Sequence, residues 1–129
     1  MDFRIDPTNR LPIYRQLGEQ IREAVARGRL QPGEQLPSVR DLSRTLVVNP
    51  NTVARVYTEL EREGVLHTRQ GLGVFVAELK AELTKRARKA RLDELLDRLL
   101  TEAVYLGFSA DEVVAIVAER AGQFQWSPA

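Results

Sequence analysis

The sequence predicts a mainly α-helical fold with one small β-hairpin, divided into two parts of different composition. Apolar residues recur every third or fourth position through most of the chain, a spacing typical of amphipathic helices. One stretch near the middle changes to a two-residue period interrupted by glycines, which indicates two short strands and a tight turn. From residue 78 onward Ala, Leu, Lys and Glu dominate. We therefore expect one small domain over residues 1–77 and a helical region over residues 78–129.

The composition excludes several classes of protein. The chain has 129 residues, no cysteine and a single histidine, His67, so we expect no disulfide, no metal site and no cofactor. It offers no nucleophile paired with a base and no glycine-rich phosphate loop, so no catalytic residue and no enzymatic activity are expected. The longest purely apolar run covers residues 113–118, too short to cross a membrane. The charged first residues resemble no secretion signal, so the expected location is the cytoplasm.

A first helix is predicted directly after Pro12, a residue favoured where helices begin. Gly28 lies where the C-terminal cap of this helix belongs. Residues 3–5 alternate apolar and charged side chains before the Asp6–Pro7 step, and this pattern indicates a short edge strand. The apolar positions of the helix lie four residues apart and are Ile13, Leu17, Ile21 and Val25.

Two further short helices are predicted in close succession. Ser38 is a good N-cap residue and begins the second helix. Only residues 47–48 separate that helix from Asn49 and Pro50, an N-cap followed by the proline favoured at the first helical position. The third helix ends at Gly64. Its apolar face has the helical spacing i, i+3, i+4, i+7 and consists of Val53, Val56, Tyr57 and Leu60.

A β-hairpin follows the third helix at once. Residues 65–70 and 74–77 alternate with a period of two, and the connection between them contains Gly71 and Gly73. Two short helices joined by a tight turn, with a hairpin directly after the second, outline a winged helix-turn-helix. In that fold the second helix of the pair enters the major groove of DNA, and the hairpin is the wing.

The third helix leaves the face opposite its apolar stripe free to contact DNA. Near the N-terminus of the helix this face carries Asn51, Thr52 and Arg55, with Asn49 at the cap. Asparagine pairs with adenine, arginine pairs with guanine, and threonine offers a hydroxyl or a methyl group to a base edge. The sequence therefore predicts these four residues as the base-reading set.

Further candidate DNA contacts lie on the second helix and at the wing tip. The net charge of the whole chain is only +1, yet all basic residues of the first 77 are arginine, whose planar fork suits phosphate. Phosphate contacts are expected from the second helix and minor-groove contacts from the wing. These candidates are Ser38, Arg40, Arg44, Arg69, Gln70 and Gly71.

Two other functions compete with DNA binding. The arginine-rich face would also suit a protein-interaction module that binds an acidic partner, and an enzyme is the third possibility. Asn51 and Thr52 favour DNA, because a purely electrostatic surface has no need of base-reading side chains.

The region over residues 78–129 is predicted to form a dimer. A long helix should end at Gly107, and a capping box of Ser109 and Glu112 should begin a second helix over residues 111–121. The long helix carries two adjacent apolar stripes, which need two neighbours, and the short helix supplies only one. A two-helix hairpin of this size buries too little surface to be stable alone, so the second neighbour is expected to be the same helix of another subunit. The expected dimer residues are Leu92, Leu95, Leu96, Leu99, Leu100, Ala103, Val104, Leu106, Val113 and Val117.

Residues 10–77 resemble the GntR family of bacterial regulators. The residues that carry the resemblance are the runs Leu36-Pro37-Ser38-Val39-Arg40-Asp41-Leu42 and Asn49-Pro50-Asn51-Thr52-Val53, followed by Tyr57, Leu60-Glu61, Gly64, Gly71, Gly73 and Phe75-Val76. The short tail is similar to that of the YtrA subfamily, whose appendage is a small helical dimerisation region. The resemblance implies a transcriptional regulator that contacts operator DNA. We expect it to bind an inverted-repeat operator as a homodimer, and to be a repressor because a dimer on promoter DNA most simply blocks polymerase.

The resemblance also assigns DNA-contacting residues, and this sequence departs from the family pattern at one position. It implies operator contacts from Arg40, Asn49, Asn51, Thr52, Gln70 and Gly71, and it names no small-molecule effector. The departure is Val47, where many relatives have glycine in the turn between the second and third helices. A β-branched residue resists positive φ, so this turn has either a different geometry or a strained backbone.

Overall fold

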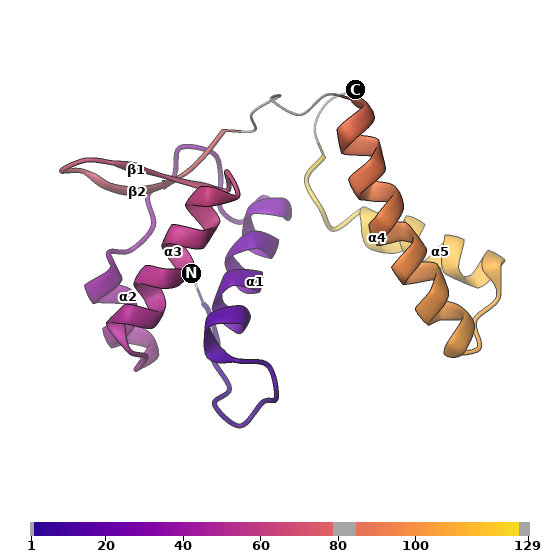
Figure 1. Ribbon diagram of the computed structural model, residues 1–129, viewed down its shortest axis with the longest axis horizontal. Coiled ribbons are helices and arrows are strands. Elements are labelled where there is room, and N and C mark those ends of the chain that lie inside the picture. Colours follow the sequence, from indigo (N-terminus) through magenta and orange to yellow (C-terminus); the bar gives the residue numbers. More distant parts are fainter. Residues whose placement is uncertain (1, 79–84, 127–129) are drawn as a thin grey trace. The chain divides into compact units, whose positions relative to one another are not determined.

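The computed structural model describes residues 2–78 and 85–126, and these residues form two compact units (Figure 1). The first unit contains helices α1 (Ile13–Ala26), α2 (Val39–Leu46) and α3 (Pro50–Arg62) and the strands β1 (Leu66–Arg69) and β2 (Gly73–Val76). The second contains α4 (Lys85–Tyr105) and α5 (Ala110–Ala121). The prediction of a mainly helical chain with one small hairpin is confirmed.

The helices of the first unit begin where their capping residues predict. At α2 the Ser38 hydroxyl oxygen accepts a hydrogen bond from the Asp41 backbone N–H at 3.0 Å. At α3 the Asn49 Oδ1 atom accepts from the Asn51 N–H at 2.8 Å, and Pro50 occupies the first helical position. Each cap satisfies a backbone donor that a helix leaves unpaired, and each stabilises its helix by about 1 kcal/mol.

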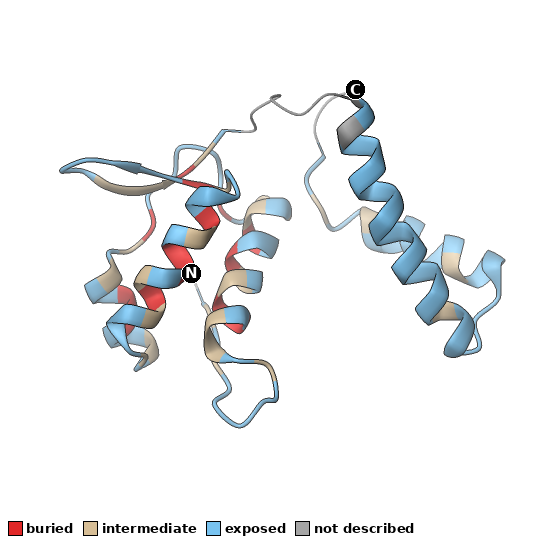
Figure 2. Ribbon diagram, in the orientation of Figure 1, coloured by how far each residue is buried: buried red, intermediate tan, exposed pale blue. Residues whose placement is uncertain are grey.

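The core of the first unit lies between α1, α3 and the hairpin, and Figure 2 shows the buried residues on the inward faces of these helices. Tyr57 of α3 belongs to this core and is 4% exposed. Its hydroxyl donates a hydrogen bond of 2.7 Å to the Pro37 carbonyl and so ties α3 to the residue before α2. The side chains that are most completely buried are Leu17, Ile21, Val53, Val56, Leu60, Leu66 and Val76.

The segment before α1 corrects one prediction, because residues 3–5 form no strand. Two glutamine side chains of α1 take the place of a strand partner. The Gln20 amide bonds both the N–H and the carbonyl of Arg4, at 2.9 and 2.6 Å. The buried Gln16 amide does the same for Asp6, at 2.9 Å in both directions. The alternating pattern is real, since Phe3 and Ile5 pack against the core, but side-chain amides satisfy the backbone.

The wing is held on both sides of β2. Strands β1 and β2 are antiparallel, with Leu66 opposite Val76 and Arg69 opposite Gly73. On its other side β2 bonds the segment before α2, through Leu36 N–H to the Val74 carbonyl at 2.8 Å and Val76 N–H to the Glu34 carbonyl at 2.9 Å. Strand β1 is shorter than the predicted 65–70, and β2 keeps the predicted length but begins one residue earlier than 74–77, with residues 70–72 forming the turn. These hydrogen bonds connect the wing to the segment that leads into α2.

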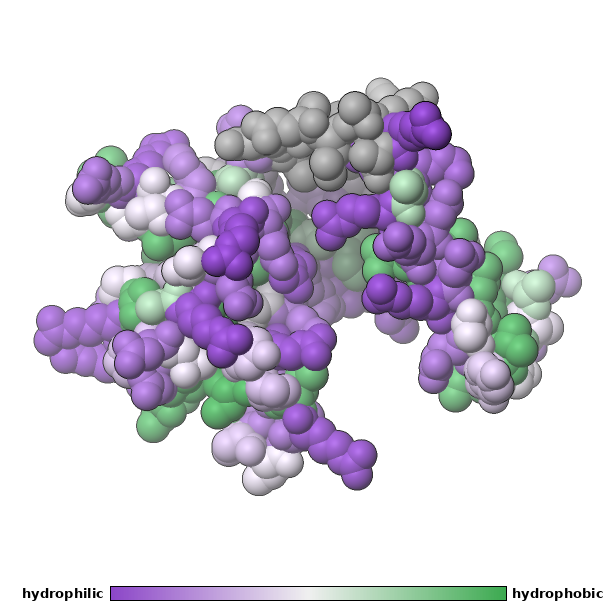
Figure 3. Space-filling model, in the orientation of Figure 1, coloured by the Kyte–Doolittle hydropathy of each residue, from purple (hydrophilic) through white to green (hydrophobic). Residues whose placement is uncertain are grey.

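The second unit is a helical hairpin whose apolar side chains remain at the surface. The predicted capping box at α5 is present, with the Ser109 N–H donating to Glu112 Oε1 and the Glu112 N–H donating to the Ser109 hydroxyl. The Ser109 N–H is the main cause that lowers the pKa of the Glu112 carboxyl. Among its described side chains none is buried, and Figure 3 shows apolar groups at the surface of α4 and α5. The predicted helical course over residues 79–84 lies outside the described residues.

Candidate nucleic-acid interface

The N-terminal turn of α3 presents polar side chains on the side away from the core. Asn51 is exposed and Thr52 is half-buried, while Val53 and Val56 on the inner side are fully buried. The Asn51 side chain is therefore free to reach a base edge, as its place opposite the apolar stripe predicts. The two N-cap residues are less free, because the oxygens of Ser38 and Asn49 already accept backbone hydrogen bonds. Their remaining donors, a hydroxyl proton and an amide NH₂, are the groups available to DNA.

The turn between α2 and α3 has a strained backbone. Val47 is the C-cap of α2 and adopts φ +55° and ψ +50°, in the left-handed region. Of the two geometries that the sequence left open, the structure has the strained one. A β-branched residue in this region costs about 1 to 3 kcal/mol. Packing of the side chain does not offset this cost, because Val47 is 90% exposed.

The arginines of α2 differ from those of α1 in their partners. Arg15, Arg22 and Arg27 of the α1 region each form an ion pair with a glutamate. Arg40 and Arg44 are exposed and have no ion-pair partner among the residues that the structure describes. Two uncompensated guanidinium groups one helical turn apart form a local positive surface, which suits phosphate oxygens.

Arg55 lies differently from the sequence expectation. Its guanidinium carbon lies 4.0 Å from the centre of the Tyr14 ring on α1, a cation–π contact. Its Nε atom also lies 3.5 Å from Glu59 Oε1. The side chain is therefore turned along the helix surface towards α1, and contact with a base requires it to leave both partners. The sequence pattern does not indicate the contact with Tyr14, because a contact between residues so distant in the chain leaves no periodic signal.

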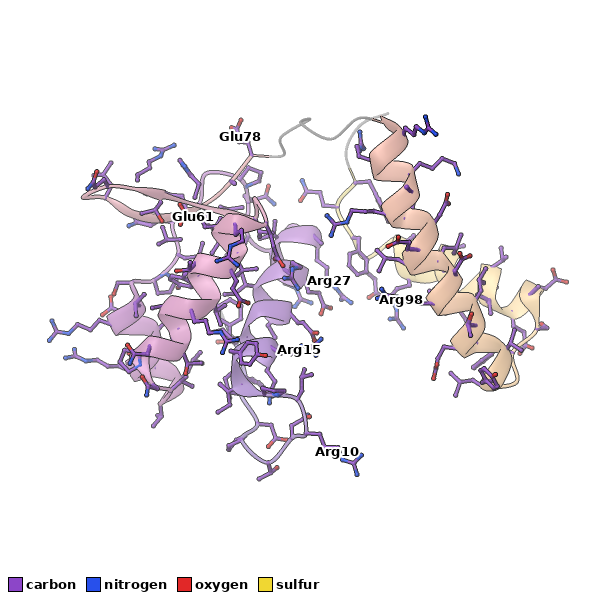
Figure 4. All side chains as sticks on the ribbon, in the orientation of Figure 1. Arg10, Arg15, Arg27, Glu61, Glu78 and Arg98 are labelled. Carbon is purple, nitrogen blue, oxygen red and sulfur yellow. The ribbon has the colours of Figure 1, made fainter. Side chains whose placement is uncertain are left out.

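The acidic residues in the second half of α3 are all engaged within the unit. Glu59 pairs with Arg55, and Glu63 accepts hydrogen bonds from Arg22. Glu61 lies beside the hairpin (Figure 4), where its carboxylate accepts from the Thr68 hydroxyl of β1 at 3.0 Å. The two ion pairs compensate the charges of Glu59 and Glu63, and the hydrogen bond of Glu61 connects the wing to α3.

The wing tip combines a guanidinium with a glycine in a left-handed backbone conformation. Arg69 lies over the Phe75 ring at 4.9 Å, and its Nε–H donates to His67 Nε2 at 3.2 Å. Gly71, at φ +81°, forms the tip next to the exposed Gln70. These residues are brought together at the end of the hairpin, as predicted.

Gln35 is a wing contact that the sequence analysis missed. It donates from Nε2 to the Leu72 carbonyl at 2.8 Å. A β-carbon on Gly73, where φ is +127°, would lie only 2.6 Å from that same nitrogen. The backbone angle favours glycine at position 73, and a side chain there would displace the end of Gln35 from the Leu72 carbonyl.

Comparison with known proteins identifies the family. The family described as "Bacterial regulatory proteins, gntR family" matches residues 13–76, which run from α1 through β2. The chain is 36% identical over 111 residues to the "HTH-type transcriptional repressor YtrA" of Bacillus subtilis (strain 168), covering 86% of this chain and 85% of that protein.

Two solved structures are similar to the chain. The "Transcriptional Antiterminator from Listeria monocytogenes EGD-e" has a TM-score of 0.80 and 33% identity, covering 100% of this chain and 97% of that one. The DNA-binding domain of AraR in complex with operator ORE1 has a TM-score of 0.51 and 27% identity, covering 60% of this chain and 94% of that one. The chain has a winged helix-turn-helix that the family model matches, and it is similar to a regulator over most of the length of both proteins. It therefore belongs to the gntR family of bacterial regulatory proteins and is a DNA-binding transcription regulator.

Proposed function

We propose that the protein is a repressor that binds an inverted-repeat operator as a homodimer. The observation that carries this proposal is the surface formed by the exposed Asn51 at the start of α3 and the exposed Arg40 and Arg44 of α2. This surface offers base recognition beside phosphate binding, which is what a sequence-specific reader needs. An acidic protein partner would not need the Asn51 amide, so DNA is the better-supported ligand. A dimer seated on promoter DNA represses most simply by excluding polymerase.

The DNA contacts divide into three groups. Arg40 and Arg44, with the Ser38 hydroxyl at the start of α2, bind phosphates and set the orientation of the domain. Asn49, Asn51 and Thr52 read base edges in the major groove, and the wing residues Arg69, Gln70 and Gly71 enter the adjacent minor groove.

Arg55 joins the base-reading set only by exchanging partners. In the free protein its charge is already used by Tyr14 and Glu59. The Arg55 side chain is 57% exposed. An exposed ion pair contributes about 0 to 1 kcal/mol, and an exposed cation–π contact contributes about 0.5 to 1 kcal/mol. A guanine bound through two hydrogen bonds is favoured over a wrong base by about 1 to 3 kcal/mol, so the exchange adds base discrimination at a site that places guanine within reach.

Dimerisation is proposed for the second unit. An apolar groove runs between α4 and α5, lined by residues that include Leu99, Leu106, Ile116 and Val117. Exposed apolar side chains follow one another along α4 from Leu92, at 64%, to Val104, at 73%, and a continuous exposed apolar surface of this kind marks an interaction site. We infer that a second copy covers the predicted residues, namely Leu92, Leu95, Leu96, Leu99, Leu100, Ala103, Val104, Leu106, Val113 and Val117.

The proposed function involves no catalysis and takes place in the cytoplasm, where operator DNA lies. Within residues 2–78 and 85–126 no helix is both long and apolar enough to cross a bilayer. The finding that supports a non-catalytic role is the similarity to transcriptional regulators.

The experiment that tests the proposal is selection of binding sites by the full-length protein from a pool of random duplexes. The enriched duplexes should share an inverted repeat with half-site centres about 10 base pairs apart, and each should bind two chains in sedimentation. A promoter that contains the selected site should lose transcription when the protein is added to purified polymerase. A pool without enrichment, a single chain per duplex, or increased transcription would contradict the corresponding part of the proposal.

A further inference from the structure

Val47 combines two features that disfavour a valine at this position. It is the only non-glycine residue with positive φ among the residues that the structure describes. Its side chain is also 90% exposed, so its two methyl groups face water. Neither feature stabilises the fold, because the backbone is strained and the apolar surface is unburied.

The chain elsewhere ends its helices with glycine when it needs this backbone conformation. Gly28 follows α1, Gly64 follows α3 and Gly107 follows α4, each with φ between +78° and +85°. Glycine at position 47 would end α2 in the same way without a steric penalty. A side chain held in a strained conformation, with no partner in its own fold, points to a role towards a ligand.

The place of Val47 in the fold indicates which ligand. It stands two residues before Asn49, so the two Cα atoms lie within about 7 Å of each other. On the other side Arg44 precedes it by three residues in the last turn of α2. Val47 therefore lies between a phosphate-binding residue and a base-reading residue, continuous with the proposed DNA surface.

The chemistry of the side chain narrows the ligand further. Valine offers only methyl groups, which neither phosphate nor the polar base edges favour. The apolar group that B-DNA displays in the major groove is the C5-methyl group of thymine. We propose that Val47 is a specificity residue that contacts the C5-methyl group of one thymine in each half-site, an inference that rests on the DNA-binding function proposed above.

The test combines a protein change with a base change in one double-mutant cycle. The probe is the duplex selected by the full-length protein, with each thymine in turn replaced by deoxyuridine, which lacks only the methyl group. Dissociation constants are measured by fluorescence anisotropy for the wild type, Val47→Ala and Val47→Gly. One replacement should weaken wild-type binding about fourfold per half-site, the value of one buried methyl-sized group. At that position the same replacement should leave both variants unchanged.

The stability of Val47→Gly supplies a second readout. Because glycine relieves the strain, this variant should unfold at a higher temperature than the wild type while it binds the thymine duplex more weakly. A matched control is Leu72→Ala, which removes an exposed apolar side chain at the wing. The wing faces the minor groove, where the thymine methyl group is absent, so this variant should keep the wild-type response to deoxyuridine.

The inference is overturned if every deoxyuridine position affects wild type and Val47 variants equally, or if Val47→Gly binds the thymine duplex as tightly as the wild type. Its failure is distinguishable from failure of the proposed function. If no sequence is enriched from the pool, sequence-specific binding itself is wrong. If a sequence is enriched and the cycle shows no coupling, only the role of Val47 is wrong.

Discussion

Replacing Tyr57 with phenylalanine tests how α2 and α3 are held together. The change removes one oxygen and keeps the ring in the core, where Tyr57 is 4% exposed. The lost interaction is the 2.7 Å hydrogen bond to the Pro37 carbonyl. Such a bond contributes about 0.5 to 1.5 kcal/mol, and a buried carbonyl left without a donor adds to the loss. Since Pro37 is only half-buried, water recovers part of that penalty, so we expect the free energy of unfolding to fall by about 1 to 1.5 kcal/mol.

Urea unfolding of the full chain, followed by circular dichroism at a fixed protein concentration, measures this loss as a lower midpoint at unchanged slope. In a thermal scan it should appear as a decrease of about 4 to 8 °C per kcal/mol. Tyr105→Phe is the matched control, because Tyr105 is 82% exposed on α4 and should change nothing. Unchanged stability of Tyr57→Phe, or an equal loss in the control, would refute the reasoning.

Four further predictions concern DNA binding, assembly and pH. Asn51→Ala should weaken operator binding by about 1 to 3 kcal/mol with little effect on random DNA; an equal loss on both duplexes in anisotropy would show a phosphate contact only. Arg40→Ala should weaken binding to all sequences and reduce the slope of log K against log salt by about one per half-site, and an unchanged slope would count against a phosphate contact. A chain ending at Glu78 should sediment as a monomer and bind its operator at least about a hundredfold more weakly, since joined half-site readers gain on the order of 10² to 10⁴ in affinity; a dimeric truncated chain would contradict this. Burial raises the pKa of Tyr57 above its ordinary value of 10.0, so the unfolded chain loses this proton first as pH rises. Its contribution is complete below pH 10 and falls above it by about 1.4 kcal/mol per pH unit, a slope in alkaline unfolding that Tyr57→Phe should lack.

The sequence by itself determined the helices, their ends and the place of the hairpin. Ser38, Asn49 and Ser109 begin helices as predicted, because an N-cap bonds a backbone N–H two or three residues away. The apolar stripe of α3 correctly placed Asn51 on the outside, because the period of a helix fixes which residues lie opposite its buried face. These features depend on groups that are close in the chain, and their residue types are visible in a short stretch of sequence.

Only the tertiary structure decided which partners distant residues choose. Arg55 lies on Tyr14, and glutamines of α1 bond the backbone of residues 4 and 6, where the alternating pattern had predicted a strand. The sequence left two geometries open at Val47, and the structure shows the strained one. In each case the outcome depends on how α1, α2 and α3 pack, because packing determines which side chain reaches which group and how much strain a short turn must accept.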